Sequence, residues 1–506
     1  MDEAALFNQE DATNFRVLQK LSAQPSLLMA TERIQAEFGQ TKYKLNKMFD
    51  TLNADLVEVS DDTPSYLDDL DKGHWRGHHL TKVVMQRLRL LYLQRSYLFT
   101  VFEYQYFFSN RYPKTAYMRD HYISNAKFYE TAEHLKHLLK QEEFLPPHPA
   151  EDEEFATRLA LFQLYFVAYN GVASPFAELE GTVAQITRLL ESQFHHTLMP
   201  TQVTKLQFFL KIWLLRMLNG QHTGKALPGS QTIASHPDQL NGLHRILPAS
   251  FGLDDHELDY LYAFLVTWHY LPAAEEKAAL AGAQLPVADH LTKDFLQLIA
   301  DYHLLDEPAH ENAAIEAALQ GLHVQITTFY LAPTTFIDDD QISFFRNLYP
   351  AFDHLILTFI ARLRATPAPQ LNHTMAVNLY FSYMFTLINY LPAAIVRDRV
   401  YVCVDFAQGQ IYSDYIARTL RSFDNAFIVI ESRLSRNTDV YLSDFHDDHL
   451  NIAQVTWANP PTSTDWQELA ELTIQIKQAK MVAIPESVPD PFDLAGKESP
   501  DDSTEK

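Results

Sequence analysis

Between His121 and Lys140 the apolar residues recur with the period of an α-helix. Spacings of three and four residues place them on one buried face. They are Phe128, Ala132, Leu135, Leu138 and Leu139. The opposite face offers Asn125, Lys127, Tyr129, Thr131 and Lys136. Ser124 and Asn125 are residue types that cap a helix start. A short helix is predicted just upstream, after Pro113, so the pattern is typical of a helix-turn-helix that reads DNA.

The sequence of residues 14–59 predicts another, smaller helix-turn-helix unit. Its three helices cover FRVLQKLSAQP, TERIQAEFG and TKYKLNKMFDTLNADL, and the second ends at Gly39. Thr31 and Thr41 are placed as N-terminal caps. The third helix presents the basic residues Lys42, Lys44 and Lys47. Its residues available for the core are Tyr43, Leu45, Met48, Phe49 and Leu52. Residues 60–71 read as an acidic linker or a short wing, and residues 74–108 as a helical run that supports the second unit.

The rest of the chain falls into a long helical part and a short β-rich part. Three prolines at residues 146–149 mark a boundary, after which residues 155–391 read as successive helices whose aromatic stripes form bundle cores. Long helices that end near Arg216 and Arg362 suggest a duplicated domain. After Arg397, β-branched runs alternate with helices, which predicts a small parallel α/β domain. We therefore expect a mainly α fold with domains at residues 1–60, 72–145, 155–295, 300–395 and 398–484, and a disordered tail at 485–506.

Composition adds one informative contrast in charge. The 506-residue chain is 47% apolar and carries a net charge of −24, which suits a folded, acidic protein of several domains. Residues 72–140 nevertheless hold 12 Lys and Arg against 4 Asp and Glu, a local charge of +8. A basic island in an acidic chain is the electrostatic footprint that phosphate binding needs. Because the island coincides with the second helix pair, nucleic-acid binding should be confined to this end.

Missing features exclude several other classes of protein. Cys403 is the single cysteine, so no internal disulfide can form, as suits a reducing cytoplasm. The first ten residues lack the apolar core of a secretory signal, and no apolar run approaches the ~20 residues of a membrane helix. No P-loop, nucleophile elbow, HExxH motif or cysteine pair is present. We expect a cytoplasmic protein that is not an enzyme and has no cofactor, metal site or membrane partner.

The order of these parts resembles the Mga/AtxA family of virulence and global transcription regulators of Gram-positive bacteria. The resemblance extends from about Phe15 to about Lys480 and rests on three stretches: YISNAKFYETAEHLKHLL, TKLQFFLKIWLLRMLNGQ and VYVCVDFAQGQIYSDYIARTL. It implies that the middle repeats are similar to phosphotransferase-system regulation domains, whose histidines can be phosphorylated by a phosphocarrier protein. It also implies that the last domain is similar to enzyme IIB and supports a homodimer.

The resemblance directs attention to three histidines as phosphorylation sites. His354 stands eight residues before Arg362, which fits the frame of these domains. The corresponding stretch before Arg216 has no histidine, so His222, in the loop that follows, and His373 are further candidates. Enzyme IIB chemistry requires a cysteine at the end of the first strand. Here Cys403 lies inside the strand, and the residue nearest the loop is the carboxylate Asp405, which would repel phosphate. We expect Cys403 to be buried and the domain to be non-catalytic.

These observations predict a dimeric regulator that binds duplex DNA. The predicted DNA-contacting residues are Lys42, Lys44, Lys47, Asn125, Lys127, Tyr129 and Lys136. The lysines would contact phosphates, while Asn125 and Tyr129 are better suited to base edges. One alternative is an RNA-binding antiterminator, which shares the regulation domains, although the N-terminal module of those proteins is small and β-rich. Another is a helical scaffold protein that binds no nucleic acid.

Overall fold

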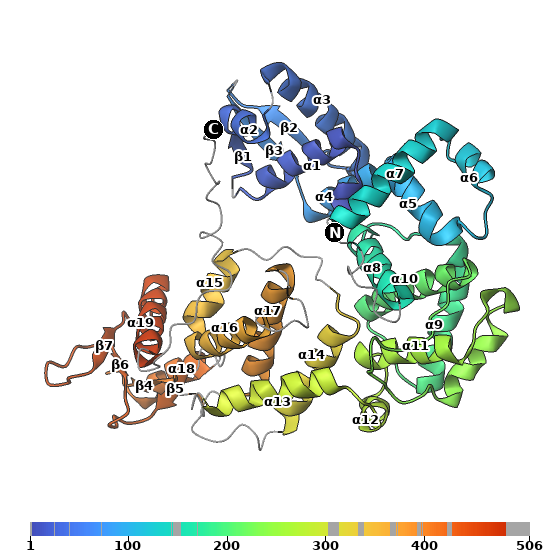
Figure 1. Ribbon diagram of the computed structural model, residues 1–506. Helices are drawn as coiled ribbons and strands as arrows, with labels where there is room; N and C mark the ends of the chain where they lie inside the picture. Colours follow the sequence, from blue (N-terminus) through green and yellow to red (C-terminus); the bar gives the residue numbers. More distant parts are fainter. Residues whose placement is uncertain are drawn as a thin grey trace, which may run out of the picture. The chain divides into compact units, whose positions relative to one another are not determined.

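The computed structural model is mainly helical and ends in a region with a small parallel four-stranded sheet (Figure 1). It describes residues 3–24, 26–39, 41–71, 73–142, 144, 153–169, 171–301, 313–331, 339–364, 371, 373–391, 396, 398–421 and 428–481. The chain divides into two compact units, Met1–Gln284 and Leu285–Lys506. The finer division into domains stays a prediction, and the predicted tail at 485–506 lies outside the described residues.

The first 94 residues combine helices with a small antiparallel sheet. After the short 3-10 turn η1 (Glu3–Leu6), the elements are α1 (Gln9–Ser22), β1 (Leu28–Ala30), α2 (Thr31–Phe38), α3 (Lys42–Val59), β2 (Tyr66–Asp69), β3 (His74–His78) and α4 (Lys82–Gln94). The three predicted helices within residues 14–59 are confirmed. The strand order is β1-β3-β2, with Met29 opposite Trp75 and Leu67 opposite Gly77.

The prediction that residues 74–108 are helical throughout is wrong for His74–His78, which form the central strand β3. Within the acidic segment, Tyr66–Asp69 form strand β2, which pairs with β3. The reason is tertiary: the Trp75 ring stacks on Phe49 of α3, with the ring centroids 3.7 Å apart, and β3 pairs on both sides.

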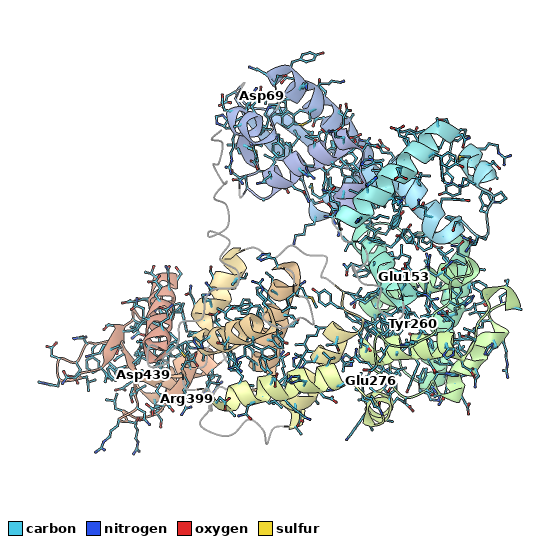
Figure 2. The ribbon with its side chains drawn as sticks, viewed as in Figure 1. Asp69, Glu153, Tyr260, Glu276, Arg399 and Asp439 are labelled. Atoms are coloured by element: carbon cyan, nitrogen blue, oxygen red, sulfur yellow. The ribbon has the colours of Figure 1, made fainter. Side chains whose placement is uncertain are left out.

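The next elements are helical and pack onto a second helical layer of the same unit. They are α5 (Tyr97–Glu103), the π-helical turn η2 (Tyr104–Phe108), α6 (Lys114–Asp120) and α7 (Asn125–Gln141). The second layer comprises α8 (Glu153–Tyr169), η3 (Ala177–Leu179), α9 (Glu180–Phe194), α10 (Pro200–Leu218), η4 (Asp238–Arg245), η5 (Ala249–Phe251), α11 (Asp255–Thr267) and α12 (Ala273–Ala281). Aromatic rings fill its core, among them Tyr260, which is labelled in Figure 2. The guanidinium of Arg158 lies over the Tyr260 ring, 4.9 Å from its centroid.

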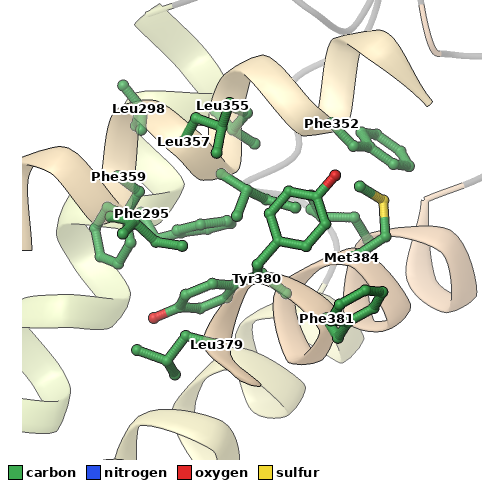
Figure 3. Packing of buried hydrophobic residues seen from close by; sticks show 14 of the residues in the cluster. Phe295, Leu298, Phe352, Leu355, Leu357, Phe359, Leu379, Tyr380, Phe381 and Met384 are labelled. Atoms are coloured by element: carbon green, nitrogen blue, oxygen red, sulfur yellow. The ribbon is translucent and has the colours of Figure 1, made fainter. Parts of the chain in front are cut away.

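The second unit begins with a bundle of five helices. They are α13 (Pro286–Asp301), α14 (Ala313–Thr327), α15 (Asp339–Leu348), α16 (Pro350–Arg364) and α17 (His373–Tyr390). Figure 3 shows their interior, where Phe295, Phe359 and Tyr380 are among the packed rings. The aromatic stripes of these helices are therefore core, as predicted. Polar residues are buried with them as well. Among these, His323 contacts Thr292 Oγ1 at 2.7 Å and the Tyr383 hydroxyl at 2.9 Å, and burial lowers its pKa to about 3.

The chain after residue 397 forms the predicted parallel α/β arrangement. Its elements are β4 (Val400–Val404), α18 (Gln410–Arg421), β5 (Ile428–Glu431), β6 (Val440–Ser443), β7 (Ala453–Thr456) and α19 (Ser463–Met481). The strand order is β5-β4-β6-β7, and all three pairings are parallel. The sequence reading missed β6. Among the described residues, no helix combines the length and apolarity that crossing a membrane requires.

Candidate nucleic-acid interface

Helix α2 ends at Phe38 and helix α3 begins at Lys42. Gly39 ends α2 in the left-handed conformation, with φ of 61°, a conformation that glycine adopts without a Cβ clash. Thr41 then caps α3, because its Oγ1 accepts a hydrogen bond from the Lys44 backbone N–H at 3.4 Å. The end of α2 and the start of α3 are thus set by the residue types at Gly39 and Thr41.

The N-terminal half of α3 presents an uninterrupted exposed polar and basic face. Its exposed residues are Lys42, Tyr43, Lys44, Asn46 and Lys47. No acidic residue precedes Asp50 on this helix. The positive end of the helix dipole adds to the lysine charges at this terminus. The arrangement can therefore attract an anionic ligand.

The assignment of Tyr43 to the core is wrong, since 81% of its surface is exposed. Tyr43 stands two residues before Leu45, about 200° around the helix from the buried stripe that Leu45 begins. The period of the helix could have shown this. Tyr43 and Asn46 are therefore additional surface residues that the sequence reading did not select for binding.

The back of α3 is fixed to the β-hairpin. The Asn53 side chain donates to the Leu67 carbonyl at 2.9 Å and accepts from the Leu67 N–H at 2.6 Å. One turn earlier, the Phe49 ring stacks on Trp75 with an interplanar angle of 16°. The orientation of the exposed face of α3 is thus fixed by contacts on the opposite side of this helix.

A shared arginine joins α3 to α1 and α4. Arg95, at the end of α4, donates from Nε to Asp11 Oδ2 at 2.8 Å, and its two Nη atoms each donate to an Asp55 carboxylate oxygen at 2.9 Å. The two carboxylates are only 8% exposed. The hydrogen bonds and charges of Asp11 and Asp55 raise the pKa of Arg95 above its ordinary value, although burial acts in the opposite direction. Arg95 therefore holds the three helices together and is not available to a ligand.

The β2–β3 hairpin beside α3 is acidic. Asp68 contacts His78 Nε2 at 3.0 Å and Asp71 contacts His74 Nδ1 at 3.0 Å. The hydrogen bond with His74 lowers the pKa of Asp71. A third acid, Asp69, is the last residue of β2 and is labelled in Figure 2. An anionic ligand on α3 would meet attraction from the helix and repulsion from this hairpin.

The second predicted helix pair, α6 and α7, has the expected turn and cap. Ser124 accepts a hydrogen bond from the Lys127 N–H at 3.2 Å. Asn125, Lys127 and Lys136 are exposed, and Tyr129 is 55% exposed. Lys114 of α6 lies over the Tyr129 ring, 5.0 Å from its centroid. All four predicted residues of α7 therefore lie at the surface.

Ion pairs reduce the positive charge that the basic island, residues 72–140, offers to a ligand. Lys127 pairs with Glu130 at 3.3 Å on the same exposed face. Within the basic island, Arg87 pairs with Asp61 at 2.6 Å, and Arg95 is engaged as described above. Thr131, expected on the polar face, is buried at 5% exposure, because it follows Phe128 by one helical turn. The island is thus partly neutralised by Glu130 within it and by Asp11, Asp55 and Asp61 from outside it.

The three candidate histidines have different surroundings. His354 is half-buried on α16, next to Asp353, which accepts from the Tyr380 hydroxyl at 2.7 Å. His222 is 35% exposed and its Nδ1 lies 3.4 Å from a carboxylate oxygen of the buried Glu257. His373 is exposed at the first position of α17. His354 and His373 lie on two different helices of the second unit, and His222 lies in the first unit.

In the C-terminal sheet, Cys403 is buried as predicted, with 3% exposure. Burial, followed by the nearby carboxylates Asp405 and Glu431, raises its thiol pKa to about 11. The loop after β4 uses its own backbone donors: the Phe406 N–H donates to Ser413 Oγ at 3.0 Å and the Ala407 N–H to Asp444 Oδ1 at 2.8 Å. These donors are occupied by protein acceptors.

Comparison with known proteins adds no identification: no protein-family description matches the sequence, and no curated protein matches it either. Within the part of the chain that the structure describes, no three His, Cys, Asp or Glu side chains are grouped to hold a metal ion.

Proposed function

We propose that this chain is a transcription regulator that binds duplex promoter DNA through two N-terminal helix-turn-helix modules. The observation that carries the proposal is the exposed basic start of α3, which contrasts with the helix's anchored back. A recognition helix needs both features, because its first turns enter the major groove while the rest of the module fixes its angle. The acidic net charge of the chain confines such binding to this local surface.

The order of elements in the first module supports the same function. Helix, strand, two helices and two strands, with the sheet order β1-β3-β2, is the arrangement of winged helix-turn-helix domains. In this proposal α2 and α3 are the helix-turn-helix, and the β2–β3 hairpin is the wing. Its carboxylates would keep the wing tip away from phosphates, so α3 has to carry the recognition.

We assign different roles to the exposed residues of α3. Lys42, Lys44 and Lys47 would contact phosphates and set the register of the protein on DNA. Tyr43 and Asn46 would reach base edges, since an Asn side chain can pair with adenine through two hydrogen bonds. Both face solvent near the start of the helix.

Helix α7 would be the second contact, through Asn125, Lys127, Tyr129 and Lys136. Its exposed face also carries Glu130, which already pairs with Lys127. A phosphate would have to compete with that carboxylate. We therefore expect α7 to contribute less binding free energy than α3.

The resemblance to Mga/AtxA regulators supplies the rest of the proposal. Carbohydrate status would reach this cytoplasmic regulator through phosphorylation of His354, His222 or His373 by a phosphotransferase-system phosphocarrier. His373 is exposed at a helix start, where the dipole favours an added anion. The C-terminal module would serve homodimerisation and not catalysis, which is supported by the occupied donors of its first loop and by its buried thiol.

Fluorescence anisotropy of the full chain on duplex DNA and on RNA hairpins, between ~50 and 200 mM salt, tests the function. Lys44→Glu should weaken duplex binding about tenfold or more and reduce the salt slope by at least about one. Lys127→Glu should have a smaller effect in the same direction. Lys277→Glu, at an exposed position of α12, is the matched control and should leave binding unchanged.

The outcomes separate the candidate functions. Lack of duplex binding at every salt concentration would refute the regulator. Preferential binding to RNA hairpins would favour the antiterminator alternative, and binding to neither nucleic acid would favour a helical scaffold that acts through proteins. Equal effects of Lys44→Glu and Lys277→Glu would show that binding occurs but not through α3.

A further inference from the structure

A network of buried ion pairs begins at Glu257 of α11, whose surface is wholly buried. Its carboxylate accepts hydrogen bonds from Arg158 Nη1 at 2.7 Å, from Arg158 Nη2 at 2.8 Å and from Trp213 Nε1 at 2.7 Å. Arg158 is itself only 1% exposed. Charges in such surroundings interact strongly because water does not screen them.

The network continues to the π-helical turn. Arg158 Nε donates to Glu154 Oε1 at 2.8 Å, and Glu154 also accepts from Arg216 Nε at 2.9 Å. Arg216 Nη1 then donates to the Tyr106 carbonyl at 2.5 Å. Asn219 Nδ2 is a second donor to the same carbonyl, at 3.2 Å. Two carboxylates and two guanidinium groups thus balance one another between α11 and η2.

The π-helical turn is in turn packed against the candidate reading helices. The Tyr104 ring lies 4.8 Å from the Tyr117 ring of α6 and 5.6 Å from the Phe128 ring of α7. π-helical turns are rare and strained, and they persist where side chains satisfy the displaced backbone groups. Here the donors from α10 satisfy the Tyr106 carbonyl, so their position supports the geometry of η2.

His222 is the part of this network that solvent can reach. Its Nδ1 lies 3.4 Å from Glu257 Oε1, and 35% of its side chain is exposed. Both of its neighbours in the chain are tied to the same groups: the Gln221 carbonyl accepts from Arg158 at 2.9 Å, and the Thr223 N–H donates to Glu257 at 3.0 Å. Gly252 packs against the imidazole so closely that a Cβ there would lie 2.9 Å from it. His222 therefore cannot move without disturbing Glu257 or Arg158.

We infer that a negative charge at His222 alters the packing of α6 and α7. The effect passes through the ion pairs of Glu257, Arg158, Glu154 and Arg216 to the Tyr106 carbonyl of η2, against which α6 and α7 pack. A negative charge at position 222 repels Glu257 and displaces Arg158, which Glu257 and Glu154 share. The shift of Glu154 then moves Arg216 and weakens the support of η2. The effect on DNA rests on the proposed function, whereas the coupling within the protein does not.

Hydrogen–deuterium exchange of the full chain without DNA tests the coupling. His222→Glu should speed exchange of the amides of residues 104–112 by about tenfold or more. His256→Glu is the matched control: it introduces the same charge at an exposed position directly before Glu257 in the sequence, and it should leave these amides unchanged. Unchanged exchange in His222→Glu, or an equal change in His256→Glu, would overturn the inference.

A double-mutant cycle tests the route. Arg216→Lys keeps a positive charge beside Glu154, but a single ammonium cannot replace the guanidinium that spans Glu154 and the Tyr106 carbonyl. If the network carries the coupling, His222→Glu should have little further effect on residues 104–112 in the Arg216→Lys background. Full additivity of the two changes would refute this route. If the amides of residues 104–112 exchange faster in His222→Glu but the chain binds no duplex DNA, the proposed function is refuted and the coupling within the protein is supported.

Discussion

The ion pairs of Arg95 with Asp11 and Asp55 can be used to test which interactions stabilise α3. Arg95→Met would remove the cation that two carboxylates share while keeping an unbranched side chain of similar length. Asp11 on α1 and Asp55 on α3 would remain 92% covered, each without its guanidinium partner. Methionine can still pack against Tyr92, over whose ring the guanidinium now lies at 4.5 Å. The perturbation is therefore mainly electrostatic.

The expected magnitude follows from the burial of the two acids. Breaking a buried ion pair by removing one partner costs about 3–5 kcal/mol. Arg95 itself is 33% exposed, and water can reach part of the site after substitution, so we expect about 3 kcal/mol, the lower end of that range. A loss of about 3 kcal/mol corresponds to roughly a hundredfold increase in the population of the locally open state.

Hydrogen–deuterium exchange resolved by residue is the appropriate assay, because a chain with two compact units has no single unfolding free energy. In Arg95→Met the amides of α3 should exchange about a hundredfold faster, whereas those of α16 in the other unit should not change. Adding Asp11→Asn and Asp55→Asn should restore most of the protection, since the orphaned charges are then gone. A change of less than about threefold in α3, or no rescue by the asparagines, would refute the electrostatic explanation.

Two further predictions concern other buried charges. Burial, together with Glu178, raises the pKa of Glu103 to about 7 despite a hydrogen bond from Tyr165 that lowers it. Because the folded state then holds a proton that the unfolded chain releases near pH 4.5, stability should fall as the pH rises from about 4.5 through about 7, by up to about 3 kcal/mol. Glu103→Gln should therefore raise the melting temperature at pH 8 and barely change it at pH 4.5; equal effects at both pH values would contradict this. In the second unit, Lys477→Met would leave the fully buried Asp398 carboxylate, now 3.6 Å from the ammonium, without its cation, and should cost about 3–5 kcal/mol. The melting temperature should recover in Lys477→Met with Asp398→Asn, and a double variant as unstable as the single one would show that packing and not charge is responsible.

Helical periodicity and capping chemistry predicted much of the local structure, and two errors came from applying them incompletely. The caps Thr41 and Ser124 accept the expected backbone hydrogen bonds. Tyr43 and Thr131, however, were each assigned to the wrong face of a helix. In both cases the spacing to the neighbouring buried residues already contained the answer, because residues three or four apart share a face and residues two apart do not.

The sequence by itself determined the helices, their caps, the β-rich C-terminal region and the burial of Cys403, because these follow from residue types and spacings over a few residues. It could not determine β3, whose five residues gain their stability from partners on β1 and from Phe49, 26 residues earlier in the chain. It could not determine either that Glu257 is bound by Arg158 of α8 and Trp213 of α10. Such contacts join residues far apart in the chain, for example Arg158 and Glu257, and only tertiary packing decides which charges are buried together.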